Sequence, residues 1–271
     1  MPLVIVAAGL LGAVIGSFLN VLIYRIPRKL SVVSPPSACP HCGAQIRAYD
    51  NIPVLSWVLL RAKCRACGAP ISARYPAVEL GTALLFAIVV WLFASPSAAL
   101  GMPAILVIDV IAFLYLAAVT ITLALIDVDT HTLPNAIIYP SYAVVGVLLA
   151  AASLLRGDVD SLVRALIGAA ILGAVYFALA FVHPGGMGLG DVKLALLLGF
   201  GLAWLGWDAF IVGSIAAFVL GGLFGVALML LRRAGRKTAI AFGPWMLIGA
   251  WIGILGGERL ASSYLAFYGI V

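Results

Sequence analysis

The chain has 271 residues and a formal net charge of +6. Hydrophobic residues make up 65% of it and charged residues 10%, with a mean hydropathy of +1.20, whereas soluble domains average about 45–50% apolar and about 25% charged residues. This composition excludes an ordinary water-soluble domain. Positive charge, which in a soluble protein can indicate nucleic acid binding, is therefore expected to mark membrane topology, and no nucleic-acid partner is expected.

Apolar runs of membrane-spanning length follow one another along most of the chain. An α-helix needs about 20 apolar residues to cross a bilayer, and hydropathy predicts eight such helices. The predicted spans are 3–24, 76–94, 103–126, 136–155, 162–182, 192–206, 209–231 and 240–257. We therefore expect an all-α polytopic membrane protein. No charged segment precedes the first span and no small-residue cleavage site follows it, so we expect a retained anchor rather than a removed signal peptide.

Basic residues concentrate in two polar stretches. Of the 16 lysines and arginines, eight lie within residues 25–74 and four within 232–237. The positive-inside rule then makes both stretches cytoplasmic. We expect three parts: a first transmembrane helix at 1–24, a cytoplasmic loop domain at 25–75 and a seven-helix membrane domain at 76–271.

All four cysteines lie in the predicted loop domain. They form two Cys-x-x-Cys pairs, Cys39 with Cys42 and Cys64 with Cys67, separated by 21 residues. This spacing is typical of a closed four-thiolate zinc site, which can fold a loop too small to build its own core. A reducing cytoplasm argues against two disulfides, and a redox role is the alternative. His41 is a conceivable ligand, but four thiolates saturate the ion, so we expect an exposed His41 and a structural metal.

Two aspartates stand at the predicted cytoplasmic ends of different spans. Asp127 closes the third span, and Asp191 opens the sixth after a glycine-rich run. Two carboxylates at the same depth can work as an aspartic protease pair, in which one takes a proton from water and the other polarises the scissile carbonyl. Spacing alone leaves Asp129 as an alternative to Asp127, and Asp191 as a helix N-terminal residue stabilised by the dipole. Asp109 precedes Asp127 by 18 residues, about 27 Å along the helix, and is excluded.

Several segments together resemble the type IV prepilin peptidases, the bifunctional leader peptidases and N-methyltransferases of pilus assembly and type II secretion. The resemblance covers nearly the whole chain. The matching segments are Gly16-Ser17-Phe18-Leu19-Asn20-Val21 with Arg25 and Pro27, both cysteine pairs, Asn51-Ile52-Pro53 with Ser56 and Trp57, Arg74-Tyr75-Pro76 with Val78 and Glu79, the segment from Asp127 to Pro134, the run from Gly186 to Asp191, and Phe242-Gly243-Pro244. A Gly-x-Gly-Asp helix start is shared with presenilin-like proteases, whereas the cysteine loop is not.

The resemblance implies an activity, partners and a location. It makes Asp127 and Asp191 the catalytic pair and prepilins and pseudopilins the substrates, cut after a glycine at the cytoplasmic face of a bacterial inner membrane. The new N-terminal residue, commonly phenylalanine, is then methylated from S-adenosylmethionine. The methyl donor is expected to bind within residues 39–79, with Glu79 and the segment from Asn51 to Trp57 as candidates and loop packing as the alternative. Membrane lipid is the other expected partner.

Two departures from the family pattern and two rival functions remain. Asn135 stands where many members carry aspartate, so we do not expect an essential acid there, and the segment from Pro27 to Cys39 is shorter than in many relatives. Lys193 is expected to neutralise the site or to meet a substrate carboxylate, with snorkelling to the membrane surface as the alternative. An ion transporter should place its acids near mid-bilayer, and a zinc-dependent scaffold should tolerate loss of the aspartates.

Overall fold

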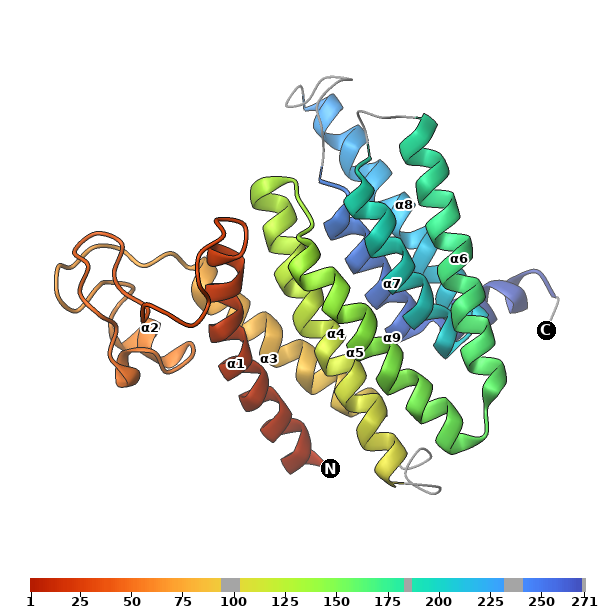
Figure 1. Cartoon of the computed structure of the whole chain (residues 1–271), viewed down its shortest axis with the longest axis horizontal. Helices are drawn as coiled ribbons and strands as arrows, with labels where there is room; N and C mark the ends of the chain where they lie inside the picture. The colour runs from red at the N-terminus through yellow and green to blue at the C-terminus, as the bar shows by residue number, and fades with distance from the viewer. Residues whose placement is uncertain (94–102, 183–186, 232–240, 270–271) are drawn as a thin grey trace. The chain divides into compact units, whose positions relative to one another are not determined.

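The computed structural model describes residues 1–93, 103–182, 187–231 and 241–269. The chain forms two compact units, residues 1–122 and 123–271 (Figure 1). The described residues contain helices and no strand, apart from two isolated β-bridges. The long helix α4, Pro103–Thr130, begins in the first unit and ends in the second.

In the first unit, α1 (Pro2–Arg25) and α3 (Arg74–Phe93) pack closely side by side (Figure 1). Glycines on α1 allow the two backbones to approach. A Cβ added at Gly12 would lie 2.7 Å from the Thr82 carbonyl oxygen, and one at Gly16 would lie 2.7 Å from the Glu79 Cα. Recurrent glycines in this span therefore serve helix packing.

The segment between α1 and α3 holds only a 3-10 turn, η1 (Ala48–Asp50), and a short helix, α2 (Leu55–Leu59). Each cysteine pair forms the same tight turn: the N–H of Gly43 bonds to the Cys39 carbonyl and that of Gly68 to the Cys64 carbonyl, both at 2.9 Å. Both glycines have φ of 71°, a conformation that glycine adopts without strain. The sequence repeat is thus also a structural repeat.

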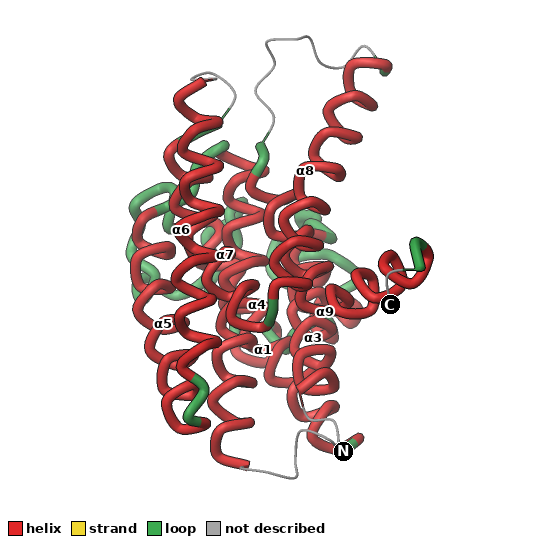
Figure 2. The backbone as a smooth tube through the Cα atoms, turned by 90° about the vertical axis from the view of Figure 1, so that its right-hand side faces the viewer, coloured by secondary structure: helices red, strands yellow, loops and turns green. Residues whose placement is uncertain are grey.

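The second unit contains α5 (Asn135–Arg156), α6 (Val159–Val182), α7 (Leu189–Leu205), α8 (Trp207–Leu230) and α9 (Gly243–Phe267). Helices α6 and α7 lie side by side, and α8 packs along α9 (Figure 2). Small residues again permit the contacts: a Cβ at Gly253 of α9 would lie 2.3 Å from the Ala209 carbonyl oxygen of α8. The core of this unit is therefore built on close backbone contacts.

The prediction of eight membrane crossings is wrong. Within the described residues, six helices are long and apolar enough to cross a membrane: α1, α3, α4, α5, α6 and α8. The predicted span 192–206 falls on α7, whose 17 residues reach about 26 Å, short of the roughly 30 Å of a hydrocarbon core. Residues 243–257 of the predicted span 240–257 fall on α9, where Glu258 and Arg259 lower the hydropathy of the second half; residue 240 lies outside the described residues. The broader prediction of a multi-pass, helical protein is confirmed.

Helix α7 explains how hydropathy misled the prediction. Ten of its 17 residues are buried by neighbouring helices, so its apolar character reflects protein packing as much as contact with lipid. A hydrophobic window cannot separate these two environments, because both select the same side chains.

Close packing of α6 on α7 gives a stability prediction. Changing Gly168 to alanine would place a Cβ 2.2 Å from the Ala203 Cβ and 2.8 Å from the Gly199 carbonyl oxygen, and overpacking of this kind costs about 1–3 kcal/mol. Gly146→Ala is the matched control, because its Cβ would meet nothing within 4 Å. We expect thermal unfolding in detergent at a lower Tm for Gly168→Ala only; equal Tm values for both variants would contradict the close contact.

Candidate functional site

Asp127 lies near the end of α4 and is only 5% exposed. Its Oδ2 accepts a hydrogen bond from the backbone N–H of Gly243 at 3.1 Å. Gly243 begins α9, and a Cβ there would lie 2.7 Å from this same oxygen. A helix N-terminus presents unpaired N–H groups and partial positive charge. The N-terminus of α9 therefore supplies a preformed hydrogen-bond partner for the Asp127 carboxylate.

Asp191 lies in the first turn of α7 and is 9% exposed. Its Oδ2 accepts the N–H of Gly188 at 2.9 Å, so the side chain caps its own helix. Gly190 allows the Leu133 segment to approach, because a Cβ there would lie 3.1 Å from the Leu133 Cβ. The glycine run therefore fixes Asp191 beside the turn that follows α4.

The structure brings Asp127 and Asp191 together within the second unit. The charge of Asp127 acts on Asp191, and Asp191 in turn interacts electrostatically with the buried Tyr176. Asp129, the alternative left open by spacing, is exposed. Each buried carboxylate uses one oxygen for a backbone N–H, so a remaining oxygen can accept a hydrogen bond from a water or, when it is protonated, donate one to a substrate carbonyl.

Lys193 lies two residues after Asp191 on α7, and its ammonium bonds to an amide. Its Nζ donates to Asn135 Oδ1 at 2.9 Å, and the ammonium lies 5.4 Å from the centroid of the Tyr139 ring. Its backbone carbonyl accepts the hydroxyl of Tyr142 at 2.7 Å. The asparagine that departs from the family pattern therefore serves as the lysine's hydrogen-bond partner in this chain.

The four cysteines form one cluster that fits a zinc ion. Their sulfur atoms all lie within 4.8 Å of one another, and Cys39 Sγ is 3.8 Å from Cys67 Sγ. Zinc–sulfur bonds of about 2.3 Å in a tetrahedron require sulfurs about 3.8 Å apart. Hydrogen bonds from the backbone of Cys42 and His41 lower the pKa of Cys39 to about 6, which favours the thiolate that a metal needs. The His41 side chain is exposed and outside the cluster.

A salt bridge joins two residues of the loop near the cysteines. Arg65, between the second pair, donates to both carboxylate oxygens of Asp50, and the closest contact is 2.6 Å. The Arg65 guanidinium holds the pKa of Asp50 below its ordinary value. Within the same loop, Trp57 Nε1 donates to the Ile71 carbonyl at 3.0 Å.

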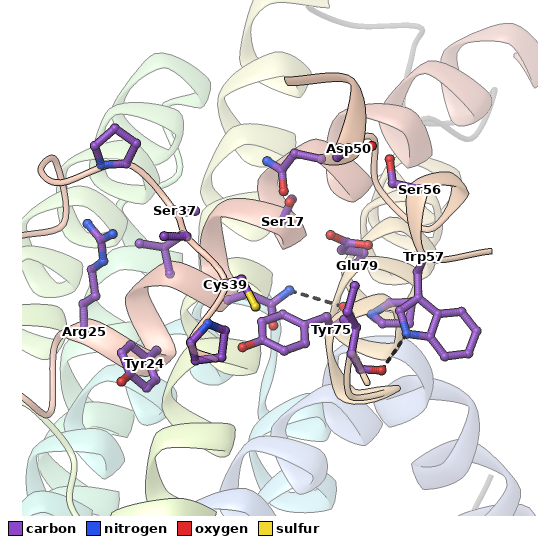
Figure 3. A pocket seen from close by; sticks show the side chains of 18 of the residues that line it. Ser17, Tyr24, Arg25, Ser37, Cys39, Asp50, Ser56, Trp57, Tyr75 and Glu79 are labelled. Atoms are coloured by element: carbon purple, nitrogen blue, oxygen red, sulfur yellow. Dashed lines mark hydrogen bonds between the residues drawn. The ribbon is translucent and has the colours of Figure 1, made fainter. Parts of the chain in front are cut away.

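Glu79 and Asn51, the candidates for the methyl-donor site, both line a pocket of about 580 Å³ in the first unit. Glu79 is buried, whereas Asn51 is exposed at the rim. Glu79 Oε2 accepts the N–H of Val54 at 2.7 Å. Figure 3 shows Glu79 between Ser17 of α1 and Trp57 of α2. Cys39 lines the same pocket, so the metal cluster and the pocket share a wall.

Sequence reasoning missed the contacts that hold the acidic groups. The hydrogen bond from the Gly243 N–H to Asp127 joins residues 116 positions apart. The only sequence signal for this contact was that Phe242-Gly243-Pro244 matches the family pattern. The strained turn at Val54, with φ of 62°, left no signal in the sequence, because valine is not a residue that predicts positive φ.

Comparisons with known proteins cover most of the chain. The family model of the bacterial peptidase A24 N-terminal domain matches residues 10–93, and that of the type IV leader peptidase family matches residues 114–226. A prepilin leader peptidase/N-methyltransferase of Stutzerimonas stutzeri is 35% identical over 98% of this chain and 96% of its own length. Proteins of the same name from Pseudomonas putida and Aeromonas hydrophila are 34% and 37% identical, over 98% and 94% of this chain and 95% and 92% of their own lengths. No solved structure matches the chain.

Proposed function

Because this chain belongs to the type IV leader peptidase family, we propose that it is a membrane-embedded aspartic endopeptidase that removes the leader peptides of type IV prepilins and pseudopilins. We further propose that it N-methylates the new N-terminal residue with S-adenosylmethionine as methyl donor. The observation that carries the proposal is the burial of Asp127 and Asp191 together in one compact unit, each fixed by a backbone N–H.

Asp127 and Asp191 are the catalytic pair in this proposal. Two neighbouring carboxylates do not both ionise readily, so in this mechanism the pair holds one proton between them. The ionised carboxylate takes a proton from the attacking water. The protonated one donates a hydrogen bond to the scissile carbonyl and later protonates the leaving amine. The exposed Asp129 has no part in the reaction.

Cys39, Cys42, Cys64 and Cys67 hold a structural zinc ion in this proposal. Zinc supplies a fixed tetrahedral centre that stabilises the fold of the loop, and four thiolates leave no open position for a reacting group. The support is the mutual distance of the four sulfurs. The loop lacks a long helix of its own, so metal binding contributes much of its stability.

The proposed organisation has three parts. A first transmembrane helix at 1–24 leads into the zinc loop at 25–75, and residues 76–271 form a membrane peptidase domain of seven helices, not all of which cross the bilayer. The eight basic residues of the loop favour the cytoplasmic side. The protein is therefore assigned to the bacterial inner membrane, with the zinc loop and the aspartates facing the cytoplasm.

The proposed function is tested on the full-length protein in detergent. The purified protein is incubated with a type IV prepilin, with and without S-adenosylmethionine, and the product is analysed by intact-mass spectrometry. We expect loss of the leader peptide in both reactions and the gain of one methyl group only with the donor. A folded, zinc-loaded protein that leaves the prepilin intact would refute the peptidase assignment.

A further inference from the structure

Tyr176 on α6 is a buried polar side chain that the mechanism described above does not use. It is 1% exposed, and its hydroxyl forms no hydrogen bond with any residue that the structure describes. Buried hydroxyls ordinarily have a partner, because desolvation without a compensating hydrogen bond costs free energy. An exception in a native fold calls for an explanation, and a donor kept for a reacting group is one.

The Tyr176 ring is held by two aromatic side chains from other helices. Its centroid lies 5.3 Å from that of Phe218 on α8 and 6.0 Å from that of Phe242, the residue before α9. The rings of Phe218 and Phe242 are themselves 5.6 Å apart, so the three rings form one cluster. Gly221 on α8 allows Phe242 to approach, because a Cβ there would lie 2.6 Å from Phe242 Cε2. The cluster therefore fixes the ring before a substrate binds.

Tyr176 lies on the face of α6 that meets α7, the helix that carries Asp191 in its first turn. A Cβ at Gly173, three residues before Tyr176, would lie 2.4 Å from Leu196 Cδ2 of α7. Residues three apart share one face of a helix. The hydroxyl interacts electrostatically with Asp191, but the two groups are not hydrogen-bonded to each other. A small group can therefore be bound by both.

The aromatic cluster also adjoins the other aspartate. Phe242 directly precedes Gly243, whose N–H bonds to Asp127 Oδ2 at 3.1 Å. Tyr176 is thus packed against the residue next to the hydrogen-bond donor of Asp127, and it interacts with Asp191. These contacts place its hydroxyl beside the position of a peptide bond that both carboxylates contact.

A hydroxyl at this position can supply what the carboxylates supply only once. A tyrosine hydroxyl is protonated at neutral pH and donates one hydrogen bond. The attacking water gives up a proton, so it needs an acceptor, which the ionised aspartate provides. The carbonyl oxygen gains negative charge in the transition state and needs donors, of which the protonated aspartate is one. A second, preformed donor is most effective in a site from which water is largely excluded.

We propose that Tyr176 is a further catalytic residue, whose hydroxyl donates a hydrogen bond to the scissile carbonyl oxygen in the transition state. The proposal rests on the proposed function. The water oxygen bonds to the carbonyl carbon as one water proton moves to the ionised aspartate, and the π electrons move onto the carbonyl oxygen. These electrons then re-form the carbonyl as the carbon–nitrogen bond breaks. The electron pair of that bond stays on nitrogen, which takes the proton of the other aspartate. Tyr176 keeps its proton throughout.

Tyr176→Phe tests the proposal, because it removes the hydroxyl and keeps the ring in the cluster. Prepilin cleavage by the full-length protein is measured in detergent. We expect kcat to fall by about 100-fold, as for the loss of one oxyanion donor. KM should stay within about threefold of the wild type, since the hydrogen bond strengthens only as charge develops. The Tm should be equal or higher, because no protein hydrogen bond is lost and one fewer polar group is buried.

Tyr142→Phe is the matched control and should give the opposite pattern. Tyr142 lies on α5 in the same unit, and its hydroxyl already donates to the Lys193 carbonyl at 2.7 Å. Removing this hydroxyl breaks a hydrogen bond within the fold. We expect a lower Tm for Tyr142→Phe, with kcat within about threefold of the wild type.

Two results for Tyr176→Phe would overturn this proposal and leave the proposed function in place. An unchanged kcat would mean that the ring serves packing alone. A Tm that falls together with kcat would make the hydroxyl a structural group. The proposed function is tested separately in the same assay: a wild-type protein that leaves prepilin intact overturns both, whereas a wild type that cuts prepilin retains the function whichever result Tyr176→Phe gives.

Discussion

Replacing Asp127 or Asp191 with asparagine is expected to reduce prepilin cleavage by about 10³-fold or more, since each substitution removes a group that must exchange protons during the reaction. The fold should survive both changes. The amide oxygen of asparagine can still accept the N–H of Gly243 at position 127 and that of Gly188 at position 191. Cleavage is measured by single-turnover kinetics, with zinc content and thermal unfolding recorded for each variant.

Asp129→Asn is the matched control, because Asp129 lies two residues from Asp127 on the same helix but is exposed. We expect its cleavage rate to stay within about threefold of the wild type, as for surface substitutions that leave the chemistry intact. An inactive Asp129→Asn beside an active Asp127→Asn would move the catalytic role to the exposed residue. Full activity of both Asp127→Asn and Asp191→Asn would favour a zinc-dependent scaffold.

Removing a cysteine of the cluster is expected to have the second large effect. A structural zinc site contributes roughly 10–16 kcal/mol of apparent binding free energy in small zinc domains. Cys67→Ser should therefore abolish stoichiometric zinc binding and unfold the loop between α1 and α3. Because Cys39 lines the Glu79 pocket, methylation should be lost with the zinc. Metal content by mass spectrometry and methylation of a cleaved pilin measure the two effects.

His41→Ala is the control for the zinc prediction, since the exposed imidazole lies outside the cluster of sulfurs. It should retain one zinc ion per chain. A zinc-free Cys67→Ser protein that still methylates normally would contradict the dependence of the pocket on the metal. Loss of zinc from His41→Ala would instead make histidine a ligand.

Local signals in the sequence were sufficient for the cysteine cluster. Two residues between paired cysteines leave room for one tight turn, and a glycine follows each pair, so the geometry is set within a few residues. The prediction of a cluster that fits a metal is confirmed by the distances between the sulfurs. An exposed His41 was also predictable, because four thiolates complete the coordination of zinc.

Features that depend on tertiary contacts were not predictable. Hydropathy assigned α7 to the membrane, although α7 is short and largely buried by protein. Spacing along the chain could not choose between Asp127 and Asp129, because only the fold buries the first and exposes the second. The approach of Gly243 to Asp127 depends on where α9 begins, which no local pattern specifies.

The most direct measurement for the central claim, that Asp127 and Asp191 act as one catalytic pair, compares each asparagine variant with the double variant. Single-turnover cleavage of a prepilin is followed with enzyme in excess, long enough to measure the residual rates. When two groups act as a unit, the first substitution already removes their joint contribution to the rate. The double variant should therefore cleave within about threefold of the slower single variant. A double variant whose rate falls by the product of the two single effects would contradict the pair.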